Sequence, residues 1–139
     1  MQESHVSVMK SGLNNGLNFI FSKYYLPDGI SEKGVDAILD YYEINSEQFD
    51  IETSIPIGAV NEIAGQLYYQ NNKEGAFELL NHGIEIHPHS AVLHASIAEL
   101  YLEESNKELA EVHYNIALRL SSRIYSEYLK YESLLKGIN

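Results

Sequence analysis

Large apolar residues recur three or four positions apart along most of the chain, the spacing of one buried face on an α-helix. The first such stripe predicts an N-terminal helix and consists of Leu13, Leu17, Ile20, Phe21 and Tyr24. The segment Leu26-Pro27-Asp28-Gly29 then predicts a turn. A second stripe predicts another helix, with Ser31 as its N-cap, and consists of Val35, Ile38, Leu39 and Tyr42.

A polar stretch from residue 43 to residue 54 follows this second helix, and Pro56 opens the next element. Proline is favoured near the first turn of a helix and disfavoured inside one. The stretch is therefore the predicted boundary between two parts of the chain, residues 1–54 and residues 55–139.

The second part contains an internal repeat. When the sequence is shifted by 34 residues, from Ile57 to Ala91, small residues fall on small residues and large apolar residues on large apolar ones. The small pairs are Ala64 with Ala98, Ala76 with Ala110, and Gly83 with Ala117. The large pairs are Ile63 with Ile97, Leu67 with Tyr101, Leu80 with Tyr114, Ile84 with Leu118, and Ile86 with Leu120. Small residues let two helices approach closely, while large ones fill the gaps between helix pairs.

This pattern resembles the tetratricopeptide repeat, whose units of 34 residues are pairs of antiparallel helices. Pro88 stands at the closing proline of the first unit, and Ser122 replaces it in the second. Val60 and His94 stand where the family has an early tryptophan. The resemblance implies an all-α fold of stacked antiparallel helix pairs, a short tetratricopeptide-like superhelix. We expect about seven helices, including a last one from about Ile124 to Leu135, with Tyr125, Tyr128, Leu129 and Leu135 as its apolar positions.

Charge and composition exclude several classes of function. The chain has 9 Lys and Arg against 20 Asp and Glu, a formal net charge of −11, which disfavours binding to nucleic acid or to an anionic membrane surface. It has no cysteine, so disulfides and thiolate metal sites are excluded. The sequence contains no apolar run of membrane-spanning length, and its first residues lack the order of a signal peptide. We expect a soluble protein, and the choice between cytoplasm and periplasm stays open.

The N-terminal part resembles the end of the catalytic domain in enterochelin-esterase-like α/β-hydrolases. The resemblance rests on Glu3-Ser4-His5-Val6-Ser7-Val8, on the helix Gly16-Leu17-Asn18-Phe19-Ile20-Phe21, on the tyrosines Tyr41 and Tyr42, and on Asn61-Glu62-Ile63-Ala64-Gly65-Gln66-Leu67-Tyr68. It implies that His5 is the base of a serine triad in the full-length hydrolase. Several members of that family append helical repeats.

The rest of a serine hydrolase site is missing from this sequence. The nucleophile normally lies in G-x-S-x-G, and the glycines with this spacing here, Gly12 and Gly16, have Asn14 between them. The chain alone is therefore not expected to be an enzyme, while a parent protein would be an esterase. The other explanation of His5 is an exposed histidine near a frayed terminus.

The other histidines do not form a metal motif. His87 and His89 flank Pro88, but no further ligands are grouped with them in sequence. His82 and His87 suit the C-terminal end of a helix, where the dipole favours a positive charge. We expect no metal and no cofactor.

The first helix of each tetratricopeptide unit lines the concave surface. On this reading Asn61, Tyr68, Tyr69 and Glu99 form the predicted partner-binding face, with Glu62, Gly65 and Glu103 beside them. Tyr24, Tyr42, Tyr101, Tyr114 and Tyr128 have the spacing of core residues instead.

The function we expect is that of a non-catalytic helical module for protein–protein interaction, domain packing or oligomerisation. Its partner would be the catalytic domain of the same protein, another protein, or a second copy of the chain. The alternative is a free-standing adaptor that binds an extended, basic peptide on the concave face.

Overall fold

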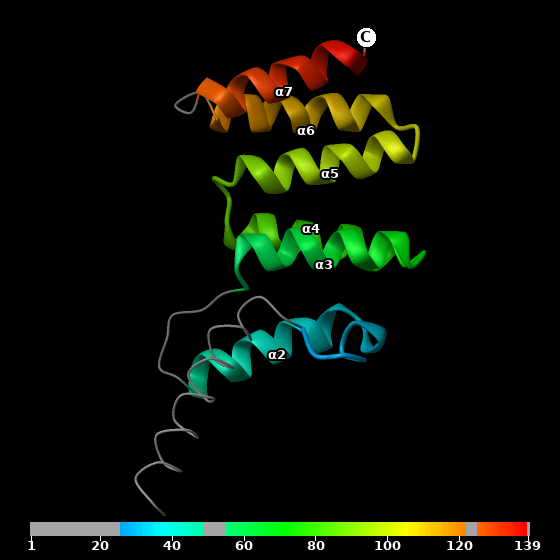
Figure 1. Cartoon of the computed structure of the whole chain (residues 1–139), viewed down its shortest axis with the longest axis vertical. Coiled ribbons are helices and arrows are strands. Elements are labelled where there is room, and N and C mark those ends of the chain that lie inside the picture. The colour runs from blue at the N-terminus through cyan, green and yellow to red at the C-terminus, as the bar shows by residue number, and fades with distance from the viewer. Residues whose placement is uncertain (1–25, 49–54, 122–124, 139) are drawn as a thin grey trace, which may run out of the picture. The chain divides into compact units, whose positions relative to one another are not determined.

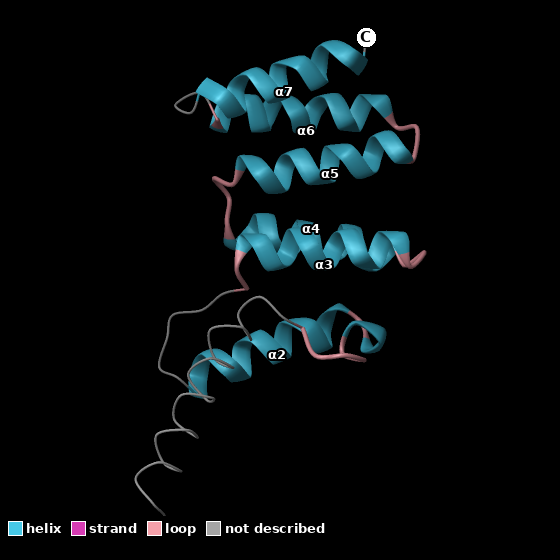
Figure 2. Ribbon diagram, viewed as in Figure 1, coloured by secondary structure: helices cyan, strands magenta, loops and turns pink. Residues whose placement is uncertain are grey.

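A computed structural model describes residues 26–48, 55–121 and 125–138 of the chain. These residues contain one short 3-10 helix and six α-helices, and no strand is found among them (Figures 1 and 2). The elements are η1 (Ser31–Lys33), α2 (Val35–Gln48), α3 (Ile57–Tyr69), α4 (Lys73–Ile86), α5 (Ala91–Glu103), α6 (Lys107–Leu120) and α7 (Tyr125–Ile138). The chain divides into two compact units, Met1–Ala59 and Val60–Asn139.

The first unit contains the predicted turn, at Asp28 and Gly29. Gly29 has φ +82° and Gly34 has φ +99°, a backbone region that favours glycine. The prediction that Ser31 caps the second helix is wrong, because residues 31–33 form η1 and Gly34 separates η1 from α2. The helix also extends to Gln48, well into the polar stretch predicted as the boundary between the two parts of the chain. Its predicted apolar face is present, with Val35, Ile38 and Tyr42 buried.

The helix pairs α3–α4 and α5–α6 have the predicted period. Each boundary of the first pair recurs 34 residues later, so that Ile57 corresponds to Ala91 and Ile86 to Leu120. The turns also correspond, since Asn72 and Asn106 cap α4 and α6 by accepting hydrogen bonds from Gly75 N and Leu109 N. The residue before each cap has positive φ, 67° at Asn71 and 60° at Ser105. Successive helices from α3 to α7 run in opposite directions (Figure 1).

The small residues of the repeat lie in the core. Ala64, Ala76, Ala98, Ala110, Gly83 and Ala117 are all buried. An added Cβ at Gly83 would lie 2.6 Å from Val60 Cγ1 and 3.2 Å from Leu93 Cδ1. There is thus no room for a larger side chain between α3, α4 and α5 at this point.

The core of the last three helices forms around one tyrosine. Tyr114 of α6 is fully buried in a cluster with alanines of α5 and α6 and with Tyr131 and Ile138 of α7. This placement confirms the prediction that Tyr114 is a core residue. Tyr42 is also buried, Tyr101 and Tyr128 are half-buried, and Tyr24 lies outside the described residues.

The predicted apolar face of the last helix is partly wrong. Leu129 is 44% exposed, whereas Tyr131 and Ile138 are buried and Leu134 and Leu135 pack beside them. The helix continues to Ile138, so its buried stripe lies further along the chain than expected. With this correction, the all-α fold of paired helices is confirmed, and the six α-helices of the described residues are close to the expected number. The helix expected near residues 13–24 lies outside the described residues.

Candidate functional site

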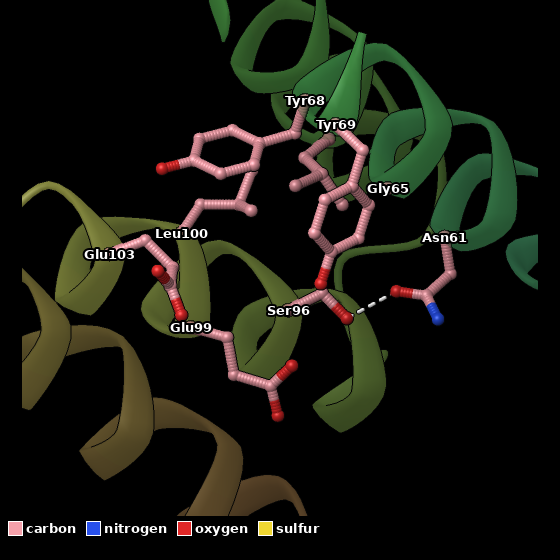
Figure 3. Close-up of a pocket in the computed structure, with 9 residues that line it drawn as sticks. Asn61, Gly65, Tyr68, Tyr69, Ser96, Glu99, Leu100 and Glu103 are labelled. Atoms are coloured by element: carbon pink, nitrogen blue, oxygen red, sulfur yellow. Dashed lines mark hydrogen bonds between the residues drawn. The ribbon is translucent and has the colours of Figure 1, made fainter. Parts of the chain in front are cut away.

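The four predicted partner-binding residues line one groove of the second unit (Figure 3). This α3–α5 groove has a volume of about 270 Å³. Its lining comes from α3 (Asn61, Gly65, Tyr68, Tyr69), α4 (Leu80) and α5 (Ser96, Glu99, Leu100, Glu103). Of the three residues that the sequence placed beside this face, Gly65 and Glu103 are part of the lining and Glu62 is not. Ser96 lines the groove and was not expected. The binding role of these residues stays a prediction.

Tyr68 is held at the end of the groove by a network of polar contacts. Its hydroxyl donates a hydrogen bond to Glu104 Oε1 at 2.6 Å. Lys73 Nζ lies 2.6 Å from the same oxygen and 5.7 Å from the centre of the Tyr68 ring. The carboxylate acceptor raises the pKa of Tyr68 to about 12, because it stabilises the protonated hydroxyl. Lys73, and then Tyr68, hold the pKa of Glu104 below its usual range.

Tyr69 is the most exposed large side chain in the groove. Its exposed fraction is 91%, and its ring stands nearly perpendicular to that of Tyr68, at 82° with centroids 6.2 Å apart. The two rings diverge, and the ring of Tyr69 reaches toward Ser96 (Figure 3). The Ser96 hydroxyl donates a hydrogen bond to Asn61 Oδ1. This bond joins α5 to α3 at the opposite end of the groove. Tyr68 and Asn61 are thus engaged within the protein, whereas Tyr69 is open to a partner.

Two exposed carboxylates, Glu99 and Glu103, face the groove one helical turn apart on α5. Neither has an ion pair within the described part of the chain, in contrast to Glu104. The last turn of α5 contains no basic residue. This end of the groove is therefore negatively charged, both from the side chains and from the C-terminal end of the helix dipole.

The sequence did not reveal a histidine pair between α5 and α6. His94 Nδ1 and His113 Nδ1 lie 3.2 Å apart, close enough for one neutral ring to donate to the other. Burial, followed by the charge of His113, lowers the pKa of His94, and burial lowers that of His113. The rings continue a row of contacts through Tyr101 to Phe77. The 34-residue register could have indicated the pair, since these positions correspond to the apolar residues Val60 and Leu79 of the preceding unit.

Residues 26–48, 55–121 and 125–138 contain no group of three or more His, Asp or Glu side chains that could hold a metal ion. His5 lies outside them, so its predicted role in a triad has no geometry to support it. Within the same residues, every helix is too short or too polar to span a membrane.

The chain matches no known family model, no curated protein and no solved structure. The groove and its side chains are therefore the basis on which a function is assigned.

Proposed function

We propose that this chain is a non-catalytic helical module that holds a protein surface in the α3–α5 groove. The observation that carries the proposal is Tyr69, a large aromatic side chain that is 91% exposed at a concave site. Exposed aromatic residues in concave sites are typical of interaction anchors, because they bury much area with few rotatable bonds. Leu100, which is partly buried, adds apolar contact area beside it.

The groove suits a protein segment better than a cofactor. Its volume of about 270 Å³ is at the lower end of the ~300–1,000 Å³ typical of small-molecule sites. A side chain or two from a partner would fill it, while the rim polar groups would set orientation.

We also propose a repeat type for the module and a parent protein to which it belongs. The 34-residue period and its small residues favour a module of the tetratricopeptide type. The motif around His5 favours a serine esterase of the α/β-hydrolase superfamily as the parent protein, with His5 as the triad base in that full-length context. The partner would then be the catalytic domain of the same protein. A free-standing adaptor that binds an extended peptide is the alternative, and it would use the same groove.

A peptide selection with the full chain tests the interaction role. We would select binders from a random library of extended peptides and titrate them against the wild-type chain and the Tyr69→Ala variant. Truncation of a central anchor costs ~2 kcal/mol or more, so affinity should fall roughly thirtyfold. The thermal melt should stay unchanged, because the ring of Tyr69 is almost fully exposed.

Val112→Ala is the matched control, since Val112 is 49% exposed on α6 and does not line the groove. It should leave both the affinity and the melt unchanged. A failure to select saturable binders, or equal losses in the two variants, would reject the interaction role of the groove.

A further inference from the structure

The α3–α5 groove combines three features that together specify the chemistry of an occupant. It has room for one long side chain, a flat aromatic ring open to solvent, and two carboxylates without an ion pair among the described residues. An inference about this occupant rests on the interaction role proposed above and adds the identity of the group that is bound.

The charge at the groove is costly for the isolated protein. Glu99 and Glu103 lie in the C-terminal half of α5, where the helix dipole is negative and disfavours an acidic side chain. They are also four residues apart, so the two like charges repel each other. Lys73, the cation of the Tyr68 network, is engaged by Glu104 instead. A positive group from a partner would relieve both unfavourable interactions.

The aromatic residues favour one kind of cation. Tyr69 presents a ring face to solvent, and Tyr68 is fixed beside it by its hydrogen bond to Glu104. A guanidinium group is planar, stacks on aromatic rings, and loses hydration more readily than an ammonium group. It can also donate to two carboxylates at once, since it carries five N–H donors in a fixed plane.

We propose that the α3–α5 groove takes the arginine side chain of an extended protein segment, with the guanidinium between the Tyr69 ring and the carboxylates of Glu99 and Glu103. The apolar part of the arginine side chain would lie over Leu100, which is only partly buried. A second copy of the chain is a poor source of this group, because it would bring 20 acidic residues against 9 basic ones. The occupant is therefore a basic segment of another protein or domain.

Four short peptides that differ at one position test whether the groove binds an arginine side chain. The probes are acetyl-Ser-Gly-Ser-X-Ser-Gly-Ser-amide with X as arginine, lysine, norleucine or glutamate, titrated into the isotope-labelled full chain and followed by NMR. The arginine peptide should shift the resonances of groove residues saturably and bind at least severalfold tighter than the lysine peptide. The norleucine and glutamate peptides should not saturate. Binding of norleucine or lysine as tight as that of arginine would overturn the assignment.

A charge-matched pair of double variants locates the site. Glu99→Gln/Glu103→Gln should weaken arginine-peptide binding about tenfold, as expected when two partly exposed charge pairs are lost. Glu78→Gln/Glu111→Gln removes the same charge from exposed positions of α4 and α6 outside the groove, and should change affinity less than twofold. Equal effects of the two double variants would overturn the proposal.

The experiments distinguish a failure of the arginine site from a failure of the interaction role of the groove. Library peptides that require Tyr69 but contain no arginine would leave the interaction role intact and reject the guanidinium site. A groove that selects no Tyr69-dependent peptide would reject both.

Discussion

Tyr114 is the largest side chain that the described residues bury completely, and its hydroxyl has no hydrogen-bond partner among them. Burial, then the charge of Glu99 and the neighbouring Tyr131, raises the pKa of Tyr114 to about 12. The ring therefore fills the centre of the α5–α6–α7 core, while the hydroxyl adds a desolvation cost. The sequence predicted the ring's position from the repeat, but a missing hydrogen-bond partner depends on neighbours that only the fold brings together.

Two substitutions at this position should act in opposite directions. Tyr114→Phe keeps the ring and removes an unsatisfied buried hydroxyl, so it should raise the free energy of unfolding by ~1 kcal/mol. Tyr114→Ala leaves a cavity and should lower it by ~3–5 kcal/mol. Urea denaturation of the two variants beside the wild type measures both effects. A Phe variant that is less stable than the wild type would mean that the hydroxyl has a partner after all.

The pair of His94 and His113 should make the stability of the fold depend on pH. Both pKa values are lowered in the folded state from an ordinary value of about 6.5. Below about pH 6.5 the unfolded chain then binds protons that the folded chain does not, so the free energy of unfolding falls as pH falls. The stabilisation is full above pH 6.5 and is lost progressively toward the lowered pKa values.

His94→Val/His113→Leu is the natural control for this titration, because it installs the residues found at the corresponding positions of the first pair, Val60 and Leu79. Urea midpoints measured between pH 8 and pH 5 should fall more steeply for the wild type than for this double variant. His82, His87 and His89 remain in both proteins, so their contribution cancels in the comparison. If the two proteins lost stability equally as the pH falls, protonation of the pair would not contribute to the pH dependence of folding.

At the scale of the helix, the close approach of α3 and α4 depends on a glycine. Gly83→Ala would gain ~1 kcal/mol of helix propensity. The new methyl group, however, would meet Val60 Cγ1 at 2.6 Å, and Val60 is fully buried with a branched, stiff side chain. Overpacking typically costs ~1–3 kcal/mol, so the variant should be destabilised overall.

The second pair of helices has a larger residue at this position. Its counterpart of Gly83 is Ala117, with His94 in place of Val60. We expect Val60→Ala to restore part of the stability lost in Gly83→Ala, because it removes the contacting methyl groups. Chemical denaturation of the two single variants and the double variant gives the coupling energy. Additive losses would show that the two side chains do not meet.

The repeat made α3 to α6 predictable in detail, whereas α2 and α7 were predicted as helices with a wrong N-cap and a partly wrong buried face, respectively. In the repeat, each buried small residue has a counterpart 34 positions away, so the pattern of one helix pair supports the prediction of the other. In α7 the apolar residues Leu129 and Tyr131 both fit a helical face, and the choice of Tyr131 depends on the alanine-lined space of α5 and α6. Similarly, Gly34 ends η1 through its positive φ, a conformation that the sequence pattern around Ser31 did not indicate.

The groove was predictable in part for the same reason. The period placed Asn61, Tyr68, Tyr69 and Glu99 on the first helices of their pairs, and all four line it. The different states of the two tyrosines could not be predicted, because the Tyr68 hydroxyl donates its hydrogen bond to Glu104, 36 residues later. Contacts between pairs of helices depend on side-chain reach as well as on register. Substituting Tyr69 is therefore the cleaner test of binding.

At the scale of the whole chain, the absence of G-x-S-x-G from the sequence predicts the absence of ester turnover. The chain should hydrolyse p-nitrophenyl acetate no faster than its His5→Ala variant, since no serine in an elbow exists to be activated. Spectrophotometric assays of the two proteins measure this. Saturable hydrolysis that a serine-directed phosphonate abolishes would contradict the proposal of a non-catalytic module.

The second compact unit should fold without the first. Its core residues, from Val60 to Ile138, lie in α3 to α7, and α5 packs against α4 and α6, and α6 against α7. A helical unit of this length buries enough apolar surface to be stable alone. Residues 55–139 expressed separately should therefore melt cooperatively, within about 5 °C of the corresponding transition of the full chain, a difference of ~1 kcal/mol. Circular dichroism melts of both proteins measure this difference. The arginine peptide should also bind the fragment and the full chain equally, because the whole groove lies in this unit. A fragment without a cooperative transition would mean that residues 1–54 contribute to its core.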